Sequence, residues 1–277
     1  MTIKKIILLV LILILLVPNI CHAKLKIICS LFPQYDFTRQ ITKDFADVNL
    51  LLKPGTDPHE FDPTPRDLLN LNNSDLFIYT GDNMEHWAEK IINSLNSNVK
   101  ILNVSTGINF LNDDPHIWLN MRNAQIMAKN ILIELSRLDP DNAEFYNLNA
   151  ENLINELKIL DSEFTRFQNK NLIFAGPFSY AYFVNCYGIN YLSAYNGENE
   201  PSIKNTAEII KFIRDNNIKY IFCDAYGITS ISNSIAQQSG SEILIFNSAH
   251  DVRDNKNFIE IMKSNLNNLK IALNLND

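Results

Sequence analysis

Positive charge is scarce in this chain, which has 24 Lys and Arg against 31 Asp and Glu in 277 residues. A protein that binds nucleic acid neutralises phosphates with clustered basic side chains, so the acidic balance argues against that class. Three common catalytic signatures are also absent, namely HExxH, the phosphate-binding GKS/T loop and the GxSxG elbow. The sequence therefore gives no support for a zinc protease, a phosphate-loop nucleotide hydrolase or an α/β-hydrolase.

Cysteine is rare as well, and no two cysteines have the CxxC spacing of a metal or redox motif. Cys29, Cys186 and Cys223 follow the amino-terminal segment, and two of them lie in strand-like runs, where a buried structural thiol is the usual form. An exported protein allows one disulfide, but the sequence does not choose its partners. A cysteine-based metal site is therefore not indicated.

Only one long apolar run is present, at residues 6–17, and about a dozen residues are too few to span a bilayer. Two lysines precede the run and a small-residue end at Ala23 follows it, which is the pattern of a secretory signal peptide. We predict that residues 1–23 are a signal peptide cleaved after Ala23, and that the mature chain is periplasmic with a net charge near −9. The rival interpretation, a lipoprotein acylated at Cys21, is disfavoured because Ile20 before it is bulky.

Short β-branched runs alternate with segments of helical spacing along the rest of the chain. Continuous rather than alternating hydrophobicity is typical of strands covered on both faces, as in a parallel sheet. Because four such runs fall before residue 105 and four after residue 170, we predict an α/β protein with two lobes, each a four-stranded, mainly parallel sheet flanked by helices. The predicted strands are residues 25–30, 48–52, 75–79, 99–102, 171–175, 189–194, 219–224 and 242–247, and the predicted helices are residues 34–44, 64–72, 83–96, 203–216 and 228–238.

Residues 123–168, between the two sets of strands, contain one Pro, no Gly and many helix formers. They predict a first helix, a break at Pro140 and one long rigid helix over 142–168, with Asp141 as its N-cap. About 27 helical residues would extend roughly 40 Å, enough for a strut that joins two lobes. Two shorter helices in one domain are the alternative. The predicted domains are an N-terminal lobe at 24–140, a linking helix at 141–169 and a C-terminal lobe at 170–277.

Two stretches repeat one tripeptide: GTDPHEFDP (55–63) and DDPHIWLN (113–120) each place a histidine after Asp-Pro, in a chain with five histidines. Proline fixes its own φ and restricts the preceding Asp, so each stretch is stiff and presents one imidazole. Both follow a predicted strand, and open α/β sheets bind ligands outside the carboxyl ends of their strands. A neutral imidazole is a good ligand for zinc, manganese or iron, so His59 and His116 predict a metal site. The repeated Asp either holds the ring or only favours a turn.

The amino-acid sequence around these motifs resembles that of the metal-specific solute-binding proteins of bacterial ABC importers, the zinc and manganese family called cluster A-I. The resemblance covers nearly the whole mature chain. It implies two α/β lobes joined by one long helix, a single divalent ion in the cleft and delivery to a membrane permease, with His59 and His116 as the ligands from the N-terminal lobe. The stretches that carry it are FPQYDFTRQI (32–41), LLKPGTDPHEFDPTPRDLLNLNNSDLFIYTGDNMEHWAEKII (51–92), DPHIWLN (114–120), YAYFVNCYGI (180–189) and FIEIMKSNLNNLKIAL (258–273).

The remaining family ligands are not matched. The family places His or Glu ten residues before the Tyr of the YG landmark, and this chain has Pro177 there, which carries no donor group. The family's final acidic ligand falls on Asn247 or Ser248, and neither is a carboxylate. Two imidazoles do not complete the four or more contacts that zinc or manganese takes.

Three interpretations stay open. His250 or Asp251 could enter the cleft from a shifted loop, with Asp224 and Glu60 as further oxygen donors. Waters could instead complete an open, weaker site. The site could also be degenerate, in a protein that binds a chelated metal or acts as an adhesin-like interaction protein. His86, on a predicted helix, is interpreted as a surface or lobe-packing residue.

We therefore expect a monomeric, non-enzymatic receptor that carries zinc, manganese or iron to an ABC permease in the inner membrane. A long His-rich loop before the second DPH would favour zinc in this family, and its absence here favours manganese or iron without excluding zinc. The rival from another class is a zinc hydrolase with Glu60 as general base, but such a site needs a third protein ligand.

Overall fold

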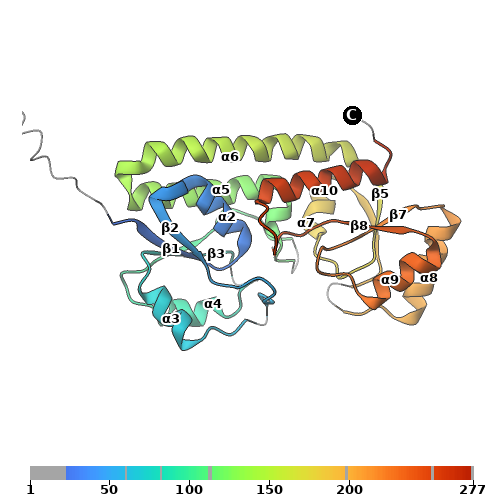
Figure 1. Cartoon of the computed structure of the whole chain (residues 1–277), viewed down its shortest axis with the longest axis horizontal. Coiled ribbons are helices and arrows are strands. Elements are labelled where there is room, and N and C mark those ends of the chain that lie inside the picture. Colours follow the sequence, from blue (N-terminus) through green and yellow to red (C-terminus); the bar gives the residue numbers. More distant parts are fainter. Residues whose placement is uncertain are drawn as a thin grey trace, which may run out of the picture.

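The computed structural model describes residues 23–59, 61–81, 83–111, 114–196, 199–250 and 253–275. All but Ala23 of the predicted signal peptide lies outside these ranges, as do Glu60 and Asp251. Within them the chain forms two α/β lobes that lie side by side beneath a layer of long helices (Figure 1). No helix in the described ranges is both long enough and apolar enough to cross a membrane.

Each lobe is built on a four-stranded sheet whose neighbouring strands are all parallel. The two sheets have the same order, β2-β1-β3-β4 in the first lobe and β6-β5-β7-β8 in the second. The eight strands and the two-lobed α/β class predicted from continuous apolar runs are confirmed. The strands are β1 (Leu25–Cys29), β2 (Ala46–Leu50), β3 (Leu76–Tyr79), β4 (Lys100–Asn103), β5 (Asn171–Phe174), β6 (Asn190–Ser193), β7 (Tyr220–Cys223) and β8 (Glu242–Ile245).

The first lobe carries helices α2 (Phe32–Thr42), α3 (Pro65–Asn72) and α4 (Ala88–Ile92). The helix predicted over 83–96 is therefore too long. The carboxylate of Glu85, fully buried, accepts the backbone amides of Thr80 and Gly81 at 2.9–3.1 Å, and this holds the chain before α4 in turns. The Asn- and Ser-rich residues after α4 have low helix propensity and also form turns.

The linking segment is α5 (Met121–Leu138) followed by α6 (Ala143–Phe164), which spans both lobes (Figure 1). Short 3₁₀ turns extend α6 at each end, over Pro140–Asn142 and Thr165–Phe167. The break at Pro140 is confirmed. Asp141 as N-cap is wrong: Asn142 occupies that position without a side-chain cap bond, because Asp141 lies inside the 3₁₀ turn.

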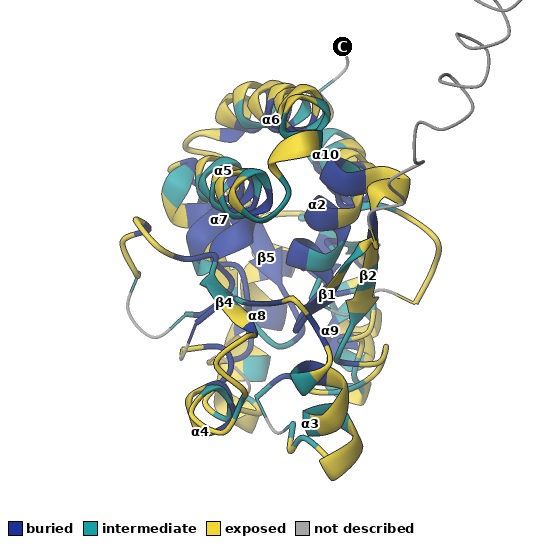
Figure 2. Cartoon of the chain, turned by 90° about the vertical axis from the view of Figure 1, so that its left-hand side faces the viewer, coloured by how far each residue is buried: buried dark blue, intermediate teal, exposed yellow. Residues whose placement is uncertain are grey.

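The second lobe carries α7 (Ala181–Cys186), α8 (Ile203–Asp215), α9 (Ser230–Ser239) and α10 (Phe258–Ala272). Helix α10 returns to the first lobe, where the ring of Phe258 meets that of Phe37 edge-on at 4.9 Å. Its first amide, Phe258 N, donates to the carboxylate of Asp36 at 3.0 Å. The lobes are thus joined by α10 as well as by α6, and α2, α5, α6 and α10 lie together above the sheets (Figure 2).

Candidate metal site

The first DPH loop follows β2 and presents His59 from a turn closed by its own aspartate. The backbone amide of His59 donates to Oδ1 of Asp57 at 2.8 Å, and the indole of Trp87 donates to the carbonyl of Pro58 at 3.1 Å. The Asp57 carboxylate therefore fixes the turn, as Asp-Pro often does. Burial lowers the pKa of the half-buried His59, and the neighbouring His116 lowers it further. The ring is thus neutral at neutral pH, the form that binds a metal.

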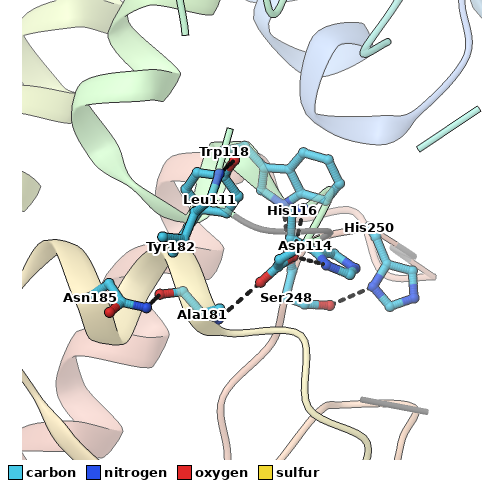
Figure 3. A network of polar contacts seen from close by, with 9 residues as sticks. All are labelled: Leu111, Asp114, His116, Trp118, Ala181, Tyr182, Asn185, Ser248 and His250. Carbon is cyan, nitrogen blue, oxygen red and sulfur yellow. Dashed lines mark hydrogen bonds and ion pairs between the residues drawn. The ribbon is translucent and has the colours of Figure 1, made fainter. Parts of the chain in front are cut away.

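The second DPH loop uses its aspartate differently. Oδ1 of Asp114 lies 2.7 Å from Nδ1 of His116 and also accepts the backbone amide of His116 at 2.9 Å. Its second oxygen, Oδ2, accepts the amide of Ala181 at the start of α7, 3.0 Å away (Figure 3). Although burial alone would raise the pKa of Asp114, its hydrogen bonds to His116 lower it, so the carboxylate is ionised. An ionised carboxylate only accepts, so Nδ1 of His116 is the donor in this contact, and Nε2 is the nitrogen left to face a metal.

A third imidazole, that of His250, enters the same region from the second lobe. It lies on the loop after β8, beyond the buried Ala249, whose φ of 59° is uncommon for a residue other than glycine. Nδ1 of His250 lies 2.5 Å from Oγ of Ser248 (Figure 3). The Ser248 carbonyl accepts the indole N–H of Trp118 at 2.7 Å. The strained turn and these two bonds hold the His250 ring beside His116.

The three rings line one cleft at the junction of the lobes, with a volume of about 250 Å³. Ring centroids are 6.2 Å apart for His59 and His116, and 5.9 Å apart for His116 and His250. Two imidazoles on one tetrahedral zinc, with Zn–N bonds of about 2.0–2.1 Å, have centroids about 5 Å apart. As the side chains stand, no group of three His, Cys, Asp or Glu residues in the described ranges is closed around a metal position.

Asp224, the carboxylate expected to donate to the metal, lies buried at the edge of this cleft after β7. Its Oδ2 accepts the amide of Ser248 at 2.7 Å, and its Oδ1 accepts the amide of Tyr226 at 3.0 Å. Asp224 therefore holds the loop that carries His250, and its role as a ligand stays a prediction. Asp251 and Glu60, the other predicted oxygen donors, lie outside the described residues.

The two positions where this chain departs from the family are now located. Pro177 lines the cleft and offers it no donor. Asn247 is tied to Asn265 and to the amide of Ala249, and Ser248 is buried behind the His250 ring. Of the interpretations left open by the sequence, the geometry thus favours His250 in the cleft. His86 is exposed and does not line it.

Sequence reasoning missed three residues around this cleft, namely Trp118, Tyr226 and Arg253. Trp118 packs on the His116 ring with centroids 5.4 Å apart and bonds the opposite loop. Tyr226 and Arg253 line the cleft from the second lobe. The available signal was proximity in the chain, since Trp118 lies two residues after His116 and Arg253 three after His250.

This chain has two α/β lobes with parallel sheets, and imidazoles from both lobes line the cleft between them. That is the architecture of a metal-binding solute receptor. Residues 27–272 match the family described as the zinc-uptake complex component A, periplasmic, and the chain belongs to that family.

Individual relatives agree with this assignment. The chain is 28% identical over 280 residues to the high-affinity zinc uptake system protein ZnuA of Bacillus subtilis (strain 168), covering 90% of this chain and 88% of that protein. The Zn(II)-bound ZnuA-like domain of Streptococcus pneumoniae AdcA superposes with a TM-score of 0.78 at 28% identity, over 90% of this chain and 99% of that one. The laminin-binding protein of Streptococcus agalactiae, described as bifunctional with adhesin and metal-transporting activity, gives a TM-score of 0.80 at 26% identity, over 90% and 99% of the two chains. The chain spans only 57% of the length of the zinc-binding protein AdcA of Streptococcus pyogenes.

Proposed function

We propose that this protein captures a zinc ion in the cleft between its lobes and delivers it to an ABC permease. The observation that carries the proposal is the convergence of His59, His116 and His250, from both lobes, on one cleft. Zinc favours nitrogen ligands in a tetrahedral arrangement, and three imidazoles supply three of its four positions. The absence of a His-rich loop favours manganese or iron. The relatives that bind zinc nevertheless support zinc as the cargo.

The ligands are prepared for the ion before it arrives. His59 is kept neutral by burial, and the ionised Asp114 holds the proton of His116 on Nδ1. His59 therefore has no proton to lose when zinc binds at neutral pH, and no covalent bond is made or broken. Because the fourth position has no protein donor at Pro177, the ion stays accessible for release to the permease.

We propose the location and the partners from the family and from the predicted signal peptide. An exported chain with a signal peptide cleaved after Ala23 would meet the permease in the periplasm at the inner membrane, where a monomer suffices because both lobes contribute ligands. The domain bounds at 24–140, 141–169 and 170–277 fit this scheme, with α10 as an additional tie between the lobes.

Metal content after zinc loading and desalting tests the proposal. Mass spectrometry of the wild type is expected to show about one zinc per chain, while His59→Ala, His116→Ala and His250→Ala each lose most of it. His86→Ala is the matched control, because His86 is exposed outside the cleft, and it should keep the wild-type content. A wild type without metal under any loading condition would favour the adhesin-like alternative, and hydrolytic turnover would favour the hydrolase.

A further inference from the structure

The chain has two tryptophans, and the indole N–H of each donates to a backbone carbonyl in a loop that carries a cleft histidine. Trp118 holds the loop of His250, across the junction of the lobes. Trp87 lies within the first lobe and donates to the carbonyl of Pro58, the residue directly before His59, at 3.1 Å. The same kind of donor therefore acts beside two different histidines of the site.

Trp87 contacts the His59 loop on both sides of the histidine. Before His59, its indole nitrogen bonds the carbonyl of the buried Pro58. After His59, the ring of Phe61 meets the Trp87 ring edge-on, with centroids 5.0 Å apart, a favourable geometry for two aromatic rings. One side chain thus restrains the backbone that carries the imidazole from two directions.

Trp87 is itself held against the sheet of the first lobe. It is the N-cap residue of α4, and two residues before it stands the fully buried Glu85. The Glu85 carboxylate accepts the backbone amides of Thr80 and Gly81 after β3 and the hydroxyl of Ser30 after β1. The two central strands of the sheet thereby fix the segment that carries the indole.

We propose that Trp87 is a positioning residue of the zinc site, which holds the His59 imidazole in the cleft through its bond to Pro58 and its ring contact with Phe61. Metal ligands must be held within about 0.5 Å of the productive geometry. Without the bond, the loop samples conformations that turn His59 away from the cleft, and zinc binding must then also order the loop. This inference rests on the proposed zinc site, and it names a residue that acts on a ligand through the backbone.

Zinc affinity of Trp87→Phe tests this role, because phenylalanine keeps an aromatic ring beside Phe61 and removes the donor. Competition with a chromophoric zinc chelator is expected to show an affinity about fivefold lower than that of the wild type. Cobalt(II) occupies tetrahedral zinc sites and absorbs visible light there, so it provides a second readout. The visible spectrum of cobalt-loaded Trp87→Phe should differ from that of the wild type, because the His59 nitrogen is displaced from the metal.

The matched control is Tyr146→Phe, which also keeps a buried ring and removes a donor. The Tyr146 hydroxyl donates to the carboxylate of Asp139 at 2.6 Å, where α5 meets α6. This variant should melt at a lower temperature but keep the zinc affinity and the cobalt spectrum of the wild type. Phe61→Leu, which keeps an apolar side chain without a ring, is a second variant and should also lower zinc affinity.

A zinc affinity and a cobalt spectrum like those of the wild type in Trp87→Phe would overturn the proposal, and so would an equal loss of affinity in Tyr146→Phe. Circular dichroism shows whether each variant folds. If Trp87→Phe does not fold, Phe61→Leu decides the question, and unchanged affinity in that variant refutes the role. Each of these results leaves zinc binding by the wild type intact, whereas a failed zinc site would show no zinc bound to the wild type.

Discussion

The indole N–H of Trp118 donates to the carbonyl of Ser248 at 2.7 Å, and this bond joins the loop that carries His116 to the loop that carries His250. Both partners are buried, so the bond is shielded from water. The Trp118 indole of the first lobe thereby fixes the position of the His250 ring of the second lobe.

Trp118→Phe keeps an aromatic ring beside His116 but leaves the Ser248 carbonyl without this donor. An unsatisfied buried polar group costs about 1–3 kcal/mol, so the free energy of unfolding should fall by that order. Urea denaturation of the metal-free protein measures the fall. Zinc affinity should also decrease, because the His250 loop loses its anchor. Unchanged affinity with reduced stability would show that the bond serves folding alone.

Asp114→Asn removes the carboxylate that holds the proton of His116 on Nδ1. Loss of such a partner behind a metal-binding histidine typically lowers affinity by about 10–100-fold. Asp57→Asn is the matched control, since Asp57 occupies the same place in its motif but, among the described residues, accepts a hydrogen bond from the backbone amide of His59 and not from its ring. Zinc competition titrations should show a much smaller effect for Asp57→Asn. Equal losses in the two variants would contradict the distinction between the two loops.

Glu85 predicts a pH dependence of stability away from the metal site. Burial raises its pKa from 4.5 to about 7 against the effect of its hydrogen bonds. Because the native state holds this proton more tightly than the unfolded chain, its contribution is fully present below the unfolded pKa of 4.5 and is lost as the pH rises through about 7. A shift of this size is worth about 3 kcal/mol.

Chemical denaturation of the metal-free protein between pH 4.5 and 8 should therefore show a decline in the wild type that Glu85→Gln reduces, because the glutamine cannot ionise. Glu89→Gln changes an exposed residue of α4 and should decline like the wild type. The interpretation fails if Glu85→Gln and the wild type have parallel profiles.

The two connections between the lobes predict a small conformational change on zinc binding. Helix α6 spans both lobes, α10 contacts α2 through Phe258, and one hydrophobic core includes residues of both lobes. Bending such a packed unit would expose apolar surface at about 25 cal/mol per Å². Small-angle X-ray scattering of the metal-free and zinc-loaded forms should give nearly equal radii of gyration. A change of several ångströms would show that the helices act as a hinge.

Most of the fold could be predicted from the sequence, because its signals are local. The apolar runs locate all eight strands of the described residues. The central strands β1, β3, β5 and β7 are largely buried, as such runs require, whereas the edge strand β6 is mostly exposed. The break at Pro140 and the long helix after it follow from helix chemistry in the same way. The helix over 83–96 was predicted too long because Glu85, which looks like an ordinary helix former, bonds backbone amides of the preceding turn.

The sequence by itself also determined the two stiff DPH segments, because proline restricts the backbone wherever it stands. Tertiary structure decided what those segments do. Asp57 and Asp114 each begin the same Asp-Pro-His tripeptide, yet of the two only Asp114 contacts an imidazole nitrogen. Likewise, the sequence offers His250 as one of several alternatives and does not select it, since the bond that joins its loop to that of His116 spans 130 residues. Contacts at that separation depend on how the two lobes pack, and no local pattern of residue types records that packing.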